Sequence, residues 1–253
     1  MSAERAALAE VLTESLNLLE PPIGVAFVDV VPAGVPRFAG RVAAGCRFWQ
    51  EAASGVFATD AADHDLCAIG TFTHNLAGTP AHESERGEAL KIFADLGYVR
   101  PEDLPRIPVL KRRALHVIYG PLARLPIEPD VVLMFARPDQ TLILSEASQQ
   151  MEGGLPPAMG RPACAIVPQA ANSGRTALSL GCCGARAYLD AFAPDTALYA
   201  VPGARLEAFT ARVVALARAN TVLTAFHKAR RRDVEAGRNP TIKESLAAMS
   251  RPG

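Results

Sequence analysis

The hydrophobic positions of the chain predict helices and strands that alternate along its length. Apolar residues three and four positions apart between residues 3 and 19 predict an amphipathic helix, which the prolines at 21 and 22 end. Continuous apolar runs, typical of buried strands, occur at 23–28, 56–59, 115–119, 131–135, 176–180 and 197–201. Helical spacing recurs at 88–96, 141–151 and 206–236, and a capping box from Thr241 to Glu244 predicts a last short helix. We therefore expect an α/β or α+β fold, with helices packed on mixed sheets and a long C-terminal helix.

One pattern of residues occurs twice. Cys46 precedes a short predicted helix that ends at a glycine, and after an apolar run the chain reaches Cys67. In the same way Cys164 precedes a helix that ends at a glycine, and a further apolar run leads to Cys182. The cysteines are 21 positions apart in the first unit and 18 in the second. Four of the five cysteines therefore occupy equivalent places in the two units.

This repetition predicts an internal duplication. The similarity extends to the strands at 115–119 and 197–201, because each is followed by an adjacent glycine and proline, in either order, and then by an arginine, Arg124 or Arg205. We expect two similar α/β halves with pseudo-repeats at 22–124 and 129–205. Together with a C-terminal helical segment at 206–250, they are predicted to form a single compact domain over residues 1–253.

Composition and charge exclude several classes of protein. The formal net charge of zero gives no general attraction to nucleic acid or to a membrane surface, so neither is an expected partner. No apolar run is long enough to cross a bilayer, and the first residues lack the features of a secretory signal. We therefore expect a soluble, cytoplasmic protein. In that reducing compartment, cysteines indicate metal binding, catalysis or plain burial more often than structural disulfides.

The context of the four repeated cysteines favours a metal centre. Backbone N–H groups at the start of a helix favour the thiolate form of Cys46 and Cys164, and the glycines near Cys67 and Cys182 let the backbone approach a ligand. Thiolates in such places bind soft metals and clusters. Zinc sites usually contain paired C-x-x-C ligands, which this sequence lacks. We therefore predict that all four ligate an iron–sulfur cluster, with 4Fe–4S favoured and zinc as the alternative.

Other interpretations of the cysteines remain open. Buried free cysteines also serve as small hydrophobic residues, and one of them could instead be the nucleophile of a metal-free enzyme. A structural zinc or metal-binding module is another alternative. If the strand at 176–180 continues to Cys182, that side chain shares a face with Leu178 and Leu180, whereas Cys183 points the opposite way. This alternation predicts Cys182 as the ligand.

Three polar residues complete the predicted site. His64 and His74 flank Cys67 in the sequence and are candidate proton donors or ligands. Arg186 follows Cys182 closely and is a candidate for binding an anion. Together they would border an open side of the centre, where a small anionic substrate binds. The function so predicted is that of a redox or cluster-dependent enzyme, an oxidoreductase or lyase, with an electron-transfer partner if the reaction is a redox reaction.

The sequence resembles domain-of-unknown-function family 169, also called ArCR-like proteins. The resemblance covers nearly the whole chain and rests on five stretches: Pro22 to Phe27, Cys46 to Ala52, Cys67 to Gly70, Pro129 to Leu133 and Ser179 to Arg186. It implies a stand-alone cytoplasmic protein and is compatible with a cysteine site. The family has no settled activity, so the resemblance implies no reaction.

Overall fold

The computed structural model describes residues 2–249 and contains one seven-stranded sheet. The strands lie in the order β2-β3-β1-β4-β7-β6-β5. Their bounds are β1 Ile23–Val28, β2 Phe57–Thr59, β3 His116–Pro121, β4 Val131–Ala136, β5 Ala158–Met159, β6 Ala177–Ser179 and β7 Ala197–Pro202. Neighbouring strands are antiparallel except β5 and β6, which are parallel, so the sheet is mixed as predicted.

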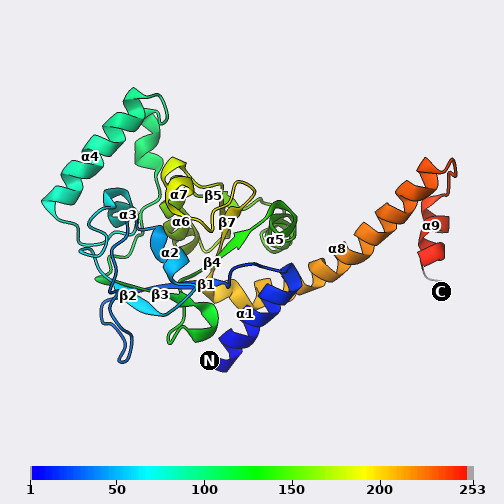
Figure 1. Ribbon diagram of the computed structural model, residues 1–253, viewed down its shortest axis with the longest axis horizontal. Coiled ribbons are helices and arrows are strands. Elements are labelled where there is room, and N and C mark those ends of the chain that lie inside the picture. The colour runs from blue at the N-terminus through cyan, green and yellow to red at the C-terminus, as the bar shows by residue number, and fades with distance from the viewer. Residues whose placement is uncertain (1, 250–253) are drawn as a thin grey trace.

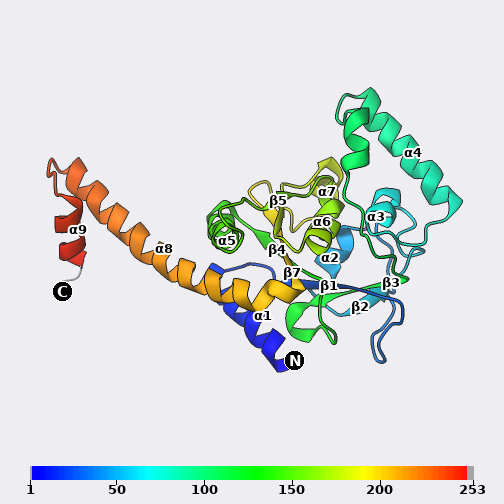
Figure 2. The same cartoon turned by 180° about the vertical axis from the view of Figure 1, so that it is seen from behind.

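Helices cover both faces of this sheet (Figures 1 and 2). The α-helices are α1 Ser2–Leu16, α2 Arg47–Glu51, α3 Ala68–Thr73, α4 Pro80–Asp95, α5 Pro138–Met151, α6 Ile166–Ser173, α7 Cys183–Tyr188, α8 Leu206–Glu235 and α9 Ile242–Met249. Short 3-10 helices are η1 Pro101–Arg106, η2 Leu122–Arg124, η3 Ala163–Ala165 and η4 Gly203–Arg205. The mixed α/β fold with a long C-terminal helix is thus confirmed. No helix among residues 2–249 is long and apolar enough to span a membrane.

The central strand β4 shows why the sheet has two cores. All six of its residues are buried, and alternate side chains point to opposite faces. Val132 and Met134 pack with apolar residues of α1, α5 and α8. Leu133 and Phe135 pack on the other face, in the core that contains α2, α6 and two cysteines. Full burial of such a side chain contributes about 1.5–3 kcal/mol to stability. Cys46 and Cys164 therefore lie in the core on the same face of the sheet as Leu133 and Phe135.

The strand order is the same in the two halves of the chain. In the first half β3 lies between β1 and β2, and in the second β7 lies between β4 and β6. Strands β1 and β4 meet in the middle of the sheet as an antiparallel pair. Helix α4 occurs only in the first half, and α5 and β5 occur only in the second. The shared order and directions are what a duplication would produce, and the duplication itself stays a prediction.

Two local predictions were wrong. The strand expected to continue toward Cys182 ends at Ser179, because Gly181 has a left-handed backbone with φ +84°. Cys182 therefore precedes helix α7 instead of ending a strand, and the argument from alternating strand faces does not apply. Helix α4 begins at Pro80 and not near residue 88, because Thr79 and His82 form a capping box in which histidine takes the place of glutamate.

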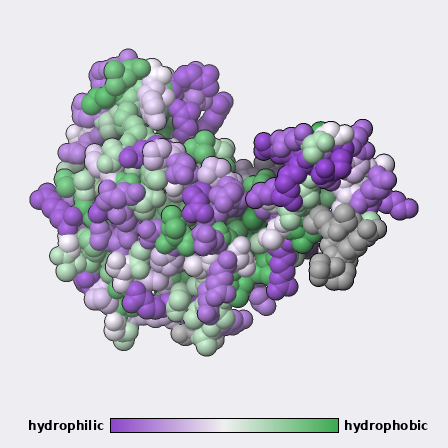
Figure 3. All heavy atoms as spheres, turned by 45° about the vertical axis from the view of Figure 1, so that its right-hand side comes forward, coloured by the Kyte–Doolittle hydropathy of each residue, from purple (hydrophilic) through white to green (hydrophobic). Residues whose placement is uncertain are grey.

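The C-terminal helices form an arm that leaves the body of the molecule (Figure 1). The buried residues of α8 lie in its first twelve positions, apart from Phe226. Helix α9 folds back against α8, and the predicted capping box at Thr241 is present because Glu244 Oε2 accepts hydrogen bonds from its N–H and hydroxyl. Polar residues cover much of the outer surface of this arm (Figure 3). Residues 1 and 250–253 of the predicted domain lie outside the described residues.

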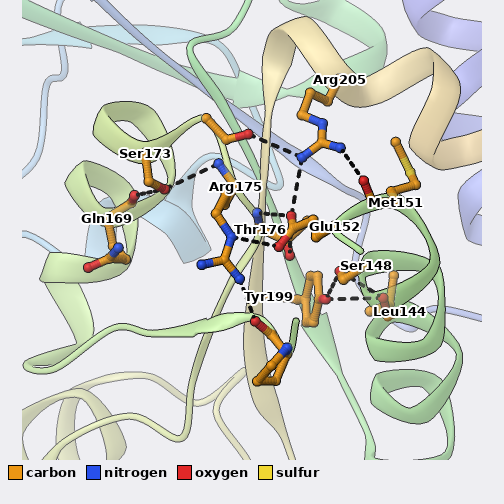
Figure 4. Close-up of polar contacts among 12 residues, drawn as sticks. Leu144, Ser148, Met151, Glu152, Gln169, Ser173, Arg175, Thr176, Tyr199 and Arg205 are labelled. Carbon is orange, nitrogen blue, oxygen red and sulfur yellow. Dashed lines mark hydrogen bonds and ion pairs between the residues drawn. The ribbon is translucent and has the colours of Figure 1, made fainter. Parts of the chain in front are cut away.

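A buried carboxylate connects three segments in the second half of the chain through hydrogen bonds (Figure 4). Glu152, at the end of α5, has a side chain that is 3% exposed. Its oxygens accept hydrogen bonds from Arg175 Nε at 3.0 Å, Thr176 N at 2.8 Å and Arg205 Nη1 at 3.3 Å. The carboxylate thus connects α5 to the start of β6 and to η4. It fixes the strand that leads into Cys182.

Candidate functional site

All five cysteines line one cavity of about 690 Å³. We call the four predicted ligands, Cys46, Cys67, Cys164 and Cys182, the cysteine quartet. Cys46, Cys67 and Cys182 each directly precede a helix, namely α2, α3 and α7, and Cys164 lies in η3 just before α6. All five cysteines of the chain are free thiols. The four cysteines predicted from the two units thus all line a single cavity, and Cys183 lines it too.

Polar donors lie beside the sulfur atoms of the quartet. The N–H of Ala185 donates to Cys182 Sγ at 3.4 Å. The N–H groups of Gly45 and Gly70 lie near Cys67 and lower its pKa, and the Thr73 hydroxyl does the same for Cys164. Such donors stabilise negative charge on sulfur.

Burial outweighs these donors at three of the four thiols. It raises the pKa of Cys46 and Cys67, and it raises the pKa of Cys164 well above its usual value. Negative charge on the other members of the quartet raises these pKa values further, so the sulfurs lie close enough to interact. Without a neighbouring cation these three thiols are protonated at neutral pH. A bound metal ion would favour the thiolate form instead, since a coordinating thiol loses its proton.

The thiols are not arranged around a single point. Among residues 2–249, no group of three or more His, Cys, Asp or Glu side chains is placed to hold one metal ion. A structural zinc ion requires four ligand atoms, with sulfurs at about 2.3 Å. The quartet therefore shares a cavity without forming a ready mononuclear site.

Tyr119, in strand β3, lies behind the quartet. Its side chain is fully buried, and its hydroxyl has no hydrogen-bond partner among the described residues. Burial, followed by the charges of Cys67, Cys46 and Cys164, raises the pKa of Tyr119 well above its usual value. The hydroxyl is thus a neutral donor close to three of the thiols. The sequence analysis missed it; the available signal was a tyrosine in a mostly apolar strand, since a buried phenol normally has a partner.

His64 and His74 are buried beside the quartet and do not line the cavity. Burial lowers the pKa of His64 to about 3 and that of His74 to about 4, so both rings are neutral at neutral pH. His64 Nε2 lies 3.3 Å from Thr59 Oγ1, and its Nδ1 has no partner among the described atoms. Neither ring nitrogen of His74 has a hydrogen bond of ordinary geometry within the described part of the chain. The two rings are 6.0 Å apart between centroids.

Arg186 holds its own loop together. Its guanidinium donates to the carbonyls of Leu180 at 2.9 Å, Ala193 at 3.0 Å and Thr196 at 3.1 Å, and it lies 4.6 Å from the centre of the Phe192 ring. It does not line the cavity. The arginines that do are Arg106 and Arg161, which sequence reasoning did not single out, because nothing local marks the segments that face each other across a cavity.

Comparison with known proteins identifies a family. Residues 11–212 match domain-of-unknown-function family 169, described as uncharacterised ArCR. No curated protein and no solved structure that was compared matches the chain. The matched residues include the whole sheet and the cysteine quartet, and they end within α8, before the projecting arm. The match covers well over half of the sequence, and the chain therefore belongs to domain-of-unknown-function family 169.

Proposed function

We propose that the protein is an iron–sulfur protein whose cysteine quartet holds a 4Fe–4S cluster and whose adjoining cavity admits a small-molecule substrate. The observation that carries this proposal is the single cavity lined by the four quartet cysteines, each of which lies just before a helix or within the short helix that precedes one. A redox reaction suits such a centre, whereas a lyase reaction would need one iron without a cysteine ligand. A redox reaction also needs an electron-transfer partner, and the reducing cytoplasm is the proposed location.

Two buried polar groups beside the quartet fit a cluster. Buried polar atoms are normally hydrogen-bonded, yet the Tyr119 hydroxyl and His64 Nδ1 have no partner among the described residues. Both atoms lie close to quartet sulfurs. Cluster sulfurs and thiolates accept hydrogen bonds, and such bonds tune the reduction potential. The cluster would therefore supply partners that the protein alone lacks.

A cluster fits this cavity better than a single zinc ion. Zinc needs its sulfurs around one point, and no three candidate ligands among residues 2–249 are so placed. In a 4Fe–4S cluster each cysteine binds a different iron, so the four sulfurs lie farther apart. A metal-free nucleophile is less favoured, because reactive cysteines have lowered pKa values and burial raises those of Cys46, Cys67 and Cys164.

The residues of the chain would then have distinct tasks. The quartet holds the cluster, which when bound would supply electron transfer. Tyr119 and His64 donate hydrogen bonds toward sulfur and remain neutral while they do so. His74 fills the space behind Cys164 and packs edge-on against Phe27 at 5.5 Å. The open side of the cavity positions the substrate.

Anaerobic purification with an absorption spectrum tests this function. The proposal predicts brown protein with broad visible absorption that dithionite bleaches. Colourless protein with one zinc per chain would support the structural zinc module instead. Metal-free protein with one rapidly alkylated buried cysteine would support the thiol enzyme.

A further inference from the structure

We infer that the cavity beside the cysteine quartet binds an amphipathic organic carboxylate, with its apolar body along helix α4 and its carboxylate at Arg161. The inference rests on the proposed function only in that the proposed cluster at the quartet is where a bound substrate would react. The binding claim itself depends on the cavity walls, which lie outside the quartet. It can therefore be tested separately from the cluster.

One wall of the cavity is an apolar surface that the fold leaves open. Helix α4 has 16 residues, and His82 is its only buried residue among those described. A surface helix of a globular protein normally buries an apolar stripe. Here Ala89, Leu90 and Phe93 face the cavity and are only half-buried. The helix projects from one corner of the body, beside η1 (Figure 1).

Apolar residues from other segments complete this surface. Leu66 and Met159 line the cavity although they are 47% and 56% exposed. Ile107 and Pro108 come from the segment after η1. Exposed apolar patches with polar edges mark binding sites, and a volume of about 690 Å³ lies within the range of small-molecule pockets. The occupant therefore has a substantial apolar part.

The charged edge of the cavity favours an anion. Arg100 and Arg106 both donate to the Asp103 carboxylate, at 2.8 Å and 3.1 Å. Arg161 is a third guanidinium near this carboxylate, and all three lower the pKa of Asp103, with Arg100 contributing most. Arg161 itself forms no ion pair within the described chain. Glu85, the other carboxylate in the lining, forms no ion pair with these arginines.

The position of Arg161 places the anion near the quartet. It lies three residues before Cys164, and its Nη2 donates to the carbonyl of Tyr98 on the opposite wall at 2.9 Å. The guanidinium thus spans the cavity between the cysteine side and the segment after α4. Its remaining N–H groups can bind a carboxylate in the planar geometry that arginine favours. An anion held there has its apolar part directed along α4.

Calorimetric titration of the anaerobically purified full chain with octanoate tests the inference. Acetate lacks the apolar body and 1-octanol lacks the charge, so we expect octanoate to bind at least about tenfold more tightly than either. Arg161→Met should weaken octanoate binding about tenfold or more, because hydrogen bonds to charged groups are strong. Arg161→Lys should retain part of the affinity. The control Arg218→Met, on α8, should bind octanoate as the unmodified chain does.

Three outcomes would overturn the inference. They are no octanoate binding at millimolar concentration, equal binding of octanoate and octanol, and unchanged affinity in Arg161→Met. Metal content is measured on the same samples. Octanoate binding by iron-free protein would refute the proposed cluster and leave this inference standing. Protein that contains iron but does not bind octanoate would refute this inference and leave the cluster standing.

Discussion

Cys67 Sγ and His64 Nδ1 both lie next to Gly70, which has no room for a side chain. A Cβ atom on Gly70 would lie 2.9 Å from Cys67 Sγ and 3.8 Å from His64 Nδ1. On the other side, a Cβ atom on Gly45 would lie 2.9 Å from His64 Nδ1 and 3.6 Å from Cys67 Sγ. Two glycines therefore bring this thiol and this imidazole together at the back of the cavity.

Gly70→Ala should disturb the metal site. The new methyl group must displace Cys67 Sγ, so we expect iron content to fall at least severalfold while the protein stays folded. The matched control is Gly87→Ala in α4, where nothing lies within 4 Å of an added Cβ. That variant should keep its iron, and its helix should gain about 0.5–1 kcal/mol. Equal iron in both variants would show that Cys67 is not a ligand.

Cys182 and Cys183 should behave differently. Both residues line the cavity, but Cys182 Sγ accepts the N–H of Ala185 and is partly buried, whereas Cys183 is exposed. We predict that Cys182→Ser loses the cluster, because serine is a poor ligand for soft metals, and that Cys183→Ser retains it. Metal analysis of the two purified variants checks this. Loss of metal only in Cys183→Ser would reverse the assignment.

Tyr119→Phe should alter the centre without unfolding the protein. It removes a hydroxyl that has no partner among the described residues, so the free energy of unfolding of the metal-free chain should change by less than about 1 kcal/mol. The reduction potential should become more negative, because a hydrogen bond to the cluster is lost.

Tyr199→Phe is the matched control for this variant. The Tyr199 hydroxyl, on the opposite face of the sheet, donates to Leu144 O at 3.0 Å and contacts Ser148 Oγ. Its loss should lower the free energy of unfolding by about 1–2 kcal/mol and leave the potential unchanged. An unchanged potential in Tyr119→Phe would remove that hydroxyl from the site.

Much of the fold can be predicted from the sequence, because buried strands and amphipathic helices have characteristic local patterns of apolar residues. The run around Leu133 predicted β4, and the apolar stripe containing Phe209 predicted the first turns of α8. The four quartet cysteines line one cavity, as expected of residues from two similar sequence units, but no three of them surround a single point among the described residues. The cavity walls did not follow, because Arg161 and Phe93 come together only through the tertiary fold.

Acid should destabilise the metal-free protein through its buried histidines. The pKa of His64 is lowered to about 3 and that of His74 to about 4 in the folded chain, from 6.5. At a pH between the folded and unfolded pKa values, the unfolded chain therefore binds more protons than the folded chain. The free energy of unfolding consequently falls as the pH falls below about 6.5. The contribution of His74 is on the order of 3 kcal/mol.

Denaturant titrations from pH 7.5 to 4.5 measure this effect. His74→Phe should flatten the dependence of the free energy of unfolding on pH. His227→Phe, on the projecting arm, should leave it as it is. An unaltered slope in His74→Phe would mean that this ring is already protonated in the folded protein or exposed to solvent.

The iron and inorganic sulfide content of the anaerobically purified chain tests the central claim most directly. The account predicts about four irons and about four sulfides per chain, and loss of both when Cys164 is replaced by serine. Protein that contains one zinc and no sulfide, or that retains its full iron content in Cys164→Ser, would contradict it.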